Sequence, residues 1–263
     1  VNTATGFRWE LFGTYTKNIN RVDRLAEGVD RITIGGFSGM AITAAVGEPF
    51  GAFYATDLRR DDQGRVIIDS ASGLPRLSTD LVYRGNYQPR FIASWGTNLR
   101  YKGFTLNVLF DTKQGGVFYS RTKDIMDFVG TAKETENRTP QVWANSVYVA
   151  ADGQYVQNTD IQYDPYDWFT STIPAGQHVV DASYVKLREA SLYYTIPSNL
   201  LQRTPFGSAS IGIYGNNLFI WTAKENMYAD PEVTSGGAGN EQGFDFSARP
   251  SLRNYGVTLR VSF

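Results

Sequence analysis

Apolar and polar residues alternate most regularly in the last ten residues of the chain, 254–263. Every second side chain from Tyr255 to Phe263 is apolar, whereas the intervening positions carry polar residues or glycine, with Arg260 among them. Successive side chains of a β-strand point to opposite faces, so this stretch predicts a strand with one apolar and one polar face. A tilted strand of about ten residues is long enough to cross a bilayer, and the same division also suits the last strand of a soluble sandwich.

Similar alternation recurs along the chain and predicts an all-β, antiparallel fold. Near the start, Trp9 and Leu11 share one face of a strand, and Arg8 and Glu10 share the other. A cation at the lipid midplane costs about 2–4 kcal/mol, and an acid somewhat less. The polar face must therefore line the aqueous interior of a barrel or form the outside of a soluble sandwich. The seven candidate membrane-crossing strands lie near 7–17, 47–57, 89–101, 103–113, 183–196, 208–221 and 251–263.

Two local features define how these strands continue. A tight connection at 102–103 joins two well-alternating strands into a hairpin. Within 184–196 the alternation changes parity midway, which predicts a β-bulge near 188–190. The alternation in 210–221 is lost in a similar way around 215–217.

Connection lengths favour a membrane barrel, because such barrels have short periplasmic turns and long extracellular loops. With Phe263 at the periplasmic end, the connections at 102–103 and 197–207 fall in the periplasm, and 58–88, 114–182 and 222–250 fall outside. The stretch 18–44 is long for a periplasmic turn and does not fit this arrangement. Seven strands cannot close a bacterial barrel, so we expect the chain to be the carboxy-terminal portion of a larger one.

Composition narrows the possibilities. The longest apolar runs are too short for a transmembrane helix, and a formal net charge of −1 gives no reason to expect a nucleic-acid partner. The chain has no cysteine, which excludes disulfides and thiolate chemistry. No signal peptide opens the sequence, so an exported protein would be represented here by a mature or fragmentary chain. The 37 aromatic residues (16 Tyr, 16 Phe and 5 Trp) suit barrel girdles and equally the stacking surfaces of a sugar-binding protein.

Catalytic, metal and cofactor sites are not indicated. His178 is the single histidine of the chain, and no Ser-His-Asp pattern is evident around it. The acidic turn at 61–64 does not match a calcium loop, because Arg59 and Gln63 occupy two of the positions that need acids. We therefore predict that the protein is not an enzyme and holds no metal or cofactor.

Aromatic residues among Asn and Asp in the long stretch 112–181 are the candidate contact residues. They allow three interpretations: stacking on sugar rings, packing against a partner protein, or holding the loop to itself. The residues that we assign to substrate or lid contact are Trp143, Tyr148, Tyr163, Tyr166, Trp168 and Phe169.

Several motifs, in the same order along the chain, resemble the SusC/RagA-like TonB-dependent transporters. The segments that carry the resemblance are 47–54 (GEPFGAFY), 85–91 (GNYQPRF), 184–194 (YVKLREASLYY), 215–222 (GNNLFIWT), 230–233 (DPEV) and 253–256 (RNYG). YVKLRE and GNNLF are the specific pieces. The terminal phenylalanine is similar to the assembly signal of outer-membrane barrels, so the resemblance assigns that signal to Tyr255, Val257, Leu259, Val261 and Phe263.

This resemblance implies a 22-stranded barrel in the bacterial outer membrane, crossed many times by the chain and plugged by an amino-terminal domain. It implies import of bulky nutrients, oligosaccharide or peptide, with energy from TonB and a SusD-like surface lipoprotein as lid. Outer-membrane lipid and the barrel-assembly machinery are further expected partners. Residues 1–263 would then belong to the carboxy-terminal part of the barrel, with the plug, the TonB-contacting segment and earlier strands outside them. The alternatives are a soluble β-sandwich that binds carbohydrate, and an outer-membrane barrel hydrolase.

Overall fold

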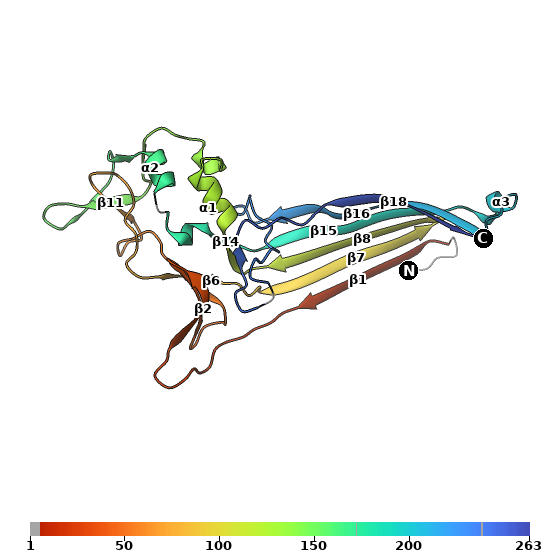
Figure 1. Cartoon of the computed structure of the whole chain (residues 1–263), viewed down its shortest axis with the longest axis horizontal. Helices are drawn as coiled ribbons and strands as arrows, with labels where there is room; N and C mark the ends of the chain where they lie inside the picture. The colour runs from red at the N-terminus through yellow and green to blue at the C-terminus, as the bar shows by residue number, and fades with distance from the viewer. Residues whose placement is uncertain (1–5, 172, 238) are drawn as a thin grey trace.

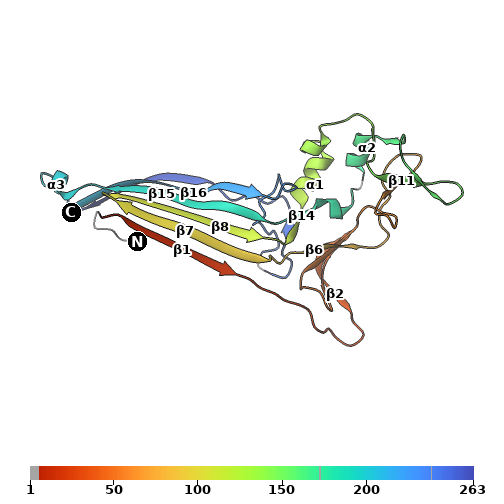
Figure 2. The same ribbon diagram turned by 180° about the vertical axis from the view of Figure 1, so that it is seen from behind.

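A computed structural model describes residues 6–171, 173–237 and 239–263, and divides the protein into a long sheet and a head. The sheet extends away from the head as a single layer (Figure 1), and the view from behind shows neither face covered by a second layer (Figure 2). Among the described residues, none of the helices has the length and apolar character needed to cross a membrane.

Six antiparallel strands form the sheet, in the order β1-β7-β8-β15-β16-β18. Within the described residues it is an open sheet rather than a closed barrel, because β1 and β18 are its two edges. A second sheet packed on the apolar face, as a soluble sandwich requires, is absent from this part of the chain. The strands are β1 (Arg8–Thr16), β7 (Phe91–Tyr101), β8 (Phe104–Gln114), β15 (Tyr184–Thr195), β16 (Ser208–Thr222) and β18 (Asn254–Ser262).

The two faces of this sheet differ as the alternation predicts. On one face the strand register aligns a row of apolar side chains, one from every strand: Trp9, Leu99, Leu106, Leu192, Ile213 and Val257. Several of them are well exposed, Ile213 at 58% and Val257 at 71%. On the other face, Asn98 Nδ2 donates to Glu10 Oε2 (3.2 Å) and Asn107 Nδ2 donates to Ser191 Oγ (3.0 Å). One face is therefore apolar and uncovered, and the opposite face is hydrogen-bonded and polar.

The expectation that 47–57 forms a seventh crossing strand is wrong. Its strand, β4 (Ala52–Ala55), has all four residues buried and pairs in a separate four-stranded sheet of order β2-β3-β4-β6. Four residues span only about 13 Å, too little for a bilayer. The alternation in this stretch reflects a buried core strand, whose side chains are covered on both faces. The partners are β2 (Arg31–Phe37), β3 (Met40–Ala45) and β6 (Val82–Asn86).

Six strands make the connections sort completely by length. The short connections at 102–103 and 196–207, the latter with helix α3 (Ser198–Leu201), lie at the end of the sheet that holds the C-terminus. The long connections 17–90, 115–183 and 223–253 all lie at the head end (Figure 1). The stretch 18–44 is thus part of one long connection, and its poor fit to a periplasmic turn is explained.

The predicted β-bulge is confirmed. The pairing of β15 with both neighbours shifts between Leu187 and Glu189, so Arg188 is the additional residue. On β16, Asn217 adopts a positive φ of 52° at the same level, where the alternation of that strand is lost. Lys186 and the bulged Arg188 both contact the loop 223–253. Beyond the bulge, the apolar residues of β15 lie at the opposite parity, because the additional residue exchanges the two faces.

The head has its own hydrophobic core, and the expectation that 112–181 lacks regular structure is wrong. Helix α1 (Arg121–Phe128) begins at Ser120, whose side chain accepts from Lys123 N, and α2 (Pro165–Thr170) begins at Asp164 in the same way. The main core cluster buries Met40, Ile42, Phe53, Ala55, Tyr87, Tyr119, Val179 and Phe244. The remaining head elements are β5 (Val66–Ile68), β9 (Val117–Ser120), β10 (Gln141–Val142), β11 (Ser146–Val149), β12 (Tyr155–Gln157), β13 (Gln162–Tyr163), β14 (Val179–Asp181), β17 (Phe244–Asp245) and 3-10 turns at Lys133–Thr135 and Ala175–His178.

Candidate functional site

A buried lysine joins β15 to the loop 223–253. Lys186 is 2% exposed, and its Nζ lies 2.9 Å from Asp230 Oδ1 and 2.5 Å from Glu232 Oε2. Asp230 also accepts from the backbone N (3.0 Å) and Oγ (2.6 Å) of Ser251. The loop is therefore held to the sheet at two points of its length, near 230 and near 251.

Arg188, at the bulge, extends this charge network across three strands. Its Nη2 lies 2.6 Å from both Asp111 Oδ2 on β8 and Glu232 Oε1 in the loop. Its Nη1 donates to Asn217 Oδ1 on β16 (2.9 Å). Lys186, Arg188, Asp111, Asp230 and Glu232 form the cluster that we call the loop anchor. The sequence motifs YVKLRE and DPEV contain four of these five residues, although alternation alone does not predict that they meet.

Both loop carboxylates of the anchor are held in the ionised form. Burial would raise the pKa of Asp230, but hydrogen bonds from Ser251 and Lys186 outweigh it and lower the pKa below its ordinary value. For Glu232, burial is likewise outweighed by hydrogen bonds from Arg188 and Lys186, so its pKa is also lowered. The anchor therefore remains charged at neutral pH.

These directions predict how the anchor responds to acid. A carboxyl whose pKa is lowered by folding stabilises the folded state above its unfolded pKa, and this stabilisation disappears as pH falls through the lower folded pKa. With ordinary values of 3.8 for Asp230 and 4.5 for Glu232, the anchor should be intact from pH 7 to 5 and lost below about pH 4. The measurement is the difference in Tm between the full-length protein and its D230N/E232Q variant across pH. A difference that has already vanished at pH 6 would contradict the assignment.

A second polar cluster lies inside the head, around His178. The ring is 1% exposed, with Nε2 at 3.0 Å from Asp127 Oδ2 and Nδ1 at 3.7 Å from Asp124 Oδ1. Lys123 Nζ lies 2.8 Å from the same Asp127 oxygen. Burial would raise the pKa of Asp127, but the hydrogen bonds from His178 and Lys123 lower it overall. The cluster ties α1 to the turn before β14, a pairing that the search for Cys or His companions of His178 could not find.

The acidic turn at 61–64 is satisfied by its own chain. Asp61 Oδ1 accepts from the backbone N of Gln63 (3.0 Å) and of Arg65 (2.8 Å), and its Oδ2 lies 2.7 Å from the Arg65 guanidinium. Across the described residues, no group of three or more His, Asp or Glu side chains is arranged to hold a metal ion.

The six aromatic residues assigned to substrate or lid contact separate into two kinds. Five belong to one cluster in the head, in which the Trp143 ring lies 5.1 Å from Tyr163 and 5.0 Å from Trp168. Trp168 is buried, and Tyr148 and Phe169 are partly buried against the same cluster. Tyr166 differs, since it is 71% exposed. The cluster holds the loop region together, and contact with substrate or a lid stays a prediction.

The residues assigned to the assembly signal lie along the edge strand β18 and its end. Tyr255, Val257 and Leu259 are each about 70% exposed (71, 71 and 67%), and Phe263 is 88% exposed. Their strand pairs on one side with β16 and has no neighbour on its other side among the described residues. Their role in assembly stays a prediction, and their common apolar face is as expected.

No family model matches the chain. Two curated proteins of Formosa agariphila do: TonB-dependent receptor P3 is 23% identical over 99% of this chain and 27% of the receptor, and TonB-dependent receptor P26 is 25% identical over 70% of this chain and 18% of the receptor. The chain resembles part of a TonB-dependent receptor. This confirms the resemblance that its motifs indicate.

Solved structures show the same likeness in the fold. The RagAB peptide transporter aligns with all of this chain and 28% of its own matched chain, at a TM-score of 0.68 and 16% identity. The RagAB peptide importer in its open-open state aligns with a TM-score of 0.66 and 15% identity, over 27% of its matched chain. The chain thus spans about a quarter of the length of these proteins. All of the matched proteins are named as receptors or transporters rather than enzymes.

Proposed function

We propose that the chain forms part of the wall and the extracellular loops of an outer-membrane transporter that imports bulky nutrients with energy from TonB. The observation that carries this proposal is the six-stranded sheet itself. It presents an uncovered apolar face on one side and a hydrogen-bonded polar face on the other, and all of its long connections lie at one end. Lipid on the first face and water on the second satisfy both, because a barrel wall separates these solvents.

The open edges support a larger barrel. Strands β1 and β18 each leave a row of backbone groups without a neighbouring strand in the described part of the chain, and such edges do not persist in lipid. We infer that further strands pair with both edges and close a barrel, for which 22 strands is the number that the family resemblance implies. The chain then crosses the outer membrane several times. The plug and the segment that contacts TonB belong, in this proposal, to residues outside these 263.

A SusD-like surface lipoprotein is the proposed partner on the outside. The head stands at the same end of the sheet as all the long loops, which is the extracellular end in a barrel of this orientation. The RagAB peptide transporter, which the fold resembles, is named for its peptide cargo. We take peptide as the first cargo to test and oligosaccharide as the second.

The test is deletion of the gene in its native cells, followed by uptake measurements with labelled peptides and oligosaccharides. We expect the deletion to abolish uptake of at least one bulky cargo, and the full-length gene to restore it. Intact-mass analysis of the detergent-extracted outer membrane should find these residues in a polypeptide much larger than 29.3 kDa. A water-soluble protein of 29.3 kDa, with unchanged uptake of every cargo, would contradict the proposal.

A further inference from the structure

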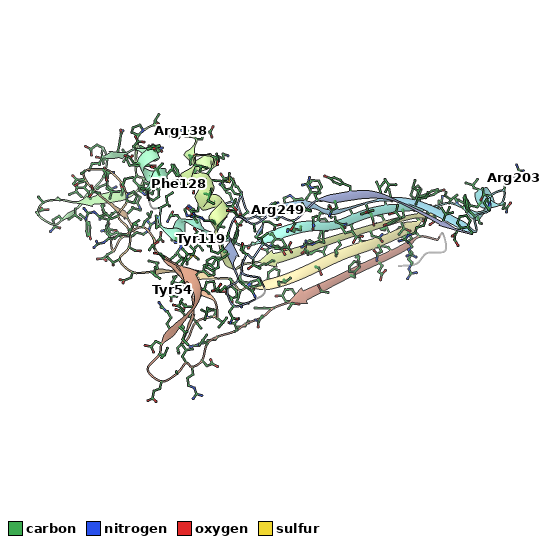
Figure 3. The ribbon with its side chains drawn as sticks, viewed as in Figure 1. Tyr54, Tyr119, Phe128, Arg138, Arg203 and Arg249 are labelled. Atoms are coloured by element: carbon green, nitrogen blue, oxygen red, sulfur yellow. The ribbon has the colours of Figure 1, made fainter. Side chains whose placement is uncertain are left out.

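A small pocket lies in the head between the C-terminal end of α1 and helix α2. Its volume is about 150 Å³, and its walls include Phe128, Pro165, Tyr166 and Phe169. Phe128 is 58% exposed and Tyr166 is 71% exposed, so two aromatic rings stand at the pocket without being covered. Figure 3 labels Phe128 on α1, with Arg138 above it on the same side of the head. The volume accommodates one side-chain-sized group rather than a complete oligomeric ligand.

One hydrogen-bond acceptor in the pocket wall lacks a partner. Asp127 lines the pocket and is 3% exposed. Its Oδ2 receives both Lys123 Nζ (2.8 Å) and His178 Nε2 (3.0 Å), whereas its Oδ1 has no hydrogen-bond partner among the described residues. A buried carboxylate oxygen without a donor is costly, so this atom marks where a ligand would donate a hydrogen bond.

The other polar side chains of the wall are already engaged. Thr135 Oγ1 donates to the carbonyl of Ala132 (2.7 Å), and Thr170 Oγ1 donates to the carbonyl of Tyr166 (2.7 Å). Arg138 directs Nη2 toward the carbonyl of Gly130 at 3.5 Å. The pocket thus offers aromatic and aliphatic walls with a single vacant acceptor, which suits an apolar group that carries one donor.

Charge and hydrogen-bond capacity distinguish the possible ligands. An ammonium group would bring a cation beside Lys123, which already neutralises Asp127, and beside Arg138 in the pocket wall. A sugar ring would bury several hydroxyls against walls that leave only one acceptor for them. A phenol carries one O–H donor on a flat apolar ring, and aromatic rings pack favourably against one another.

We propose that this pocket binds the side chain of a tyrosine in a peptide, with the phenol donating to Asp127 Oδ1. The inference rests on the proposed import function and deepens it, because it names tyrosine-containing peptides as the cargo that the head receives. Two of the six aromatic residues assigned to substrate contact, Tyr166 and Phe169, form part of this pocket.

The test is peptide binding to the purified full-length protein in detergent, measured by ligand-detected saturation-transfer NMR. The probes are two pentapeptides that carry one tyrosine or one phenylalanine between glycines. Because the phenylalanine peptide leaves the carboxylate oxygen without a donor, we expect it to bind at least about tenfold more weakly. Tyr166→Ala should weaken the tyrosine peptide without removing any hydrogen bond of the helix start, which uses only the Tyr166 backbone.

The matched control is Tyr155→Ala, which removes a 44%-exposed tyrosine on β12, outside the pocket, and should leave binding unchanged. Equal affinity for the two peptides, or unchanged binding by Tyr166→Ala, would overturn the proposal. Tighter binding of a lysine pentapeptide or of methyl glucoside would overturn the assignment to phenol. The assay does not require transport, so a deletion strain with normal peptide uptake, together with intact tyrosine-peptide binding, would contradict the import function and not the pocket.

Discussion

Val257→Arg is expected to prevent the protein from accumulating in the outer membrane, whereas Thr258→Arg, one residue further along the same strand, is tolerated. Val257 is 71% exposed on the apolar face, directly opposite Ile213 of β16. Thr258 points to the polar face. An arginine held in lipid near the midplane costs about 2–4 kcal/mol, and an arginine in water costs little.

The measurement is the amount of folded, heat-modifiable full-length protein in outer-membrane fractions, with the free energy of unfolding in lipid vesicles as a second readout. The pair of variants is matched in strand, depth and introduced charge, and differs only in the face that receives the arginine. In a soluble protein both faces contact water, so equal behaviour of the two variants would contradict a lipid-facing surface. The same result would remove the main support for the transporter.

Lys186→Met is expected to lower the free energy of unfolding by about 3 kcal/mol and to release the loop 223–253 from the sheet. Methionine keeps nearly the length of the side chain, but it leaves the buried Asp230 carboxylate without its cation. Removing one member of a buried ion pair costs about 3–5 kcal/mol, and the lower end is expected here because Arg188 still pairs with Glu232. The measurements are urea unfolding and the rate of trypsin cleavage after Lys224 and Arg253, both exposed and at the two ends of this loop.

A double variant makes this prediction specific. Asp230→Asn keeps an acceptor for Ser251 and removes the negative charge, so adding it to Lys186→Met should recover part of the lost stability. The control Glu241→Gln changes an exposed charge in the same loop, away from both trypsin sites, so it should have little effect. If Lys186→Met and Glu241→Gln unfold alike, the anchor does not hold the loop.

Hydrophobic alternation was sufficient to locate the six long strands, because a single-layer sheet with different solvents on its faces must alternate over its whole length. It also located the bulge at 188–190, since an additional residue necessarily reverses the parity of the residues after it. The short connections at the C-terminal end resulted from the same pattern. Strand 47–57 was misassigned because four alternating residues in a buried head sheet look the same as part of a crossing strand.

The head could not be predicted in this way. Its helices and strands have two to eight residues each, and periodicity needs longer windows to be distinguished from chance. The contact between Lys186 and Asp230 joins residues 44 positions apart, and that between Asp127 and His178 joins residues 51 apart. Neither charged pair has a periodic signature in the sequence.

The sequence by itself thus determined the long strands, their two faces and the family that the chain resembles, because these depend on local alternation and on contiguous motifs. The tertiary structure decided which aromatic residues are packed and which are exposed, how the loop anchor pairs its charges, and where an acceptor is left without a donor. These properties depend on which distant segments meet, and that is set by the packing of the head and loops against one another.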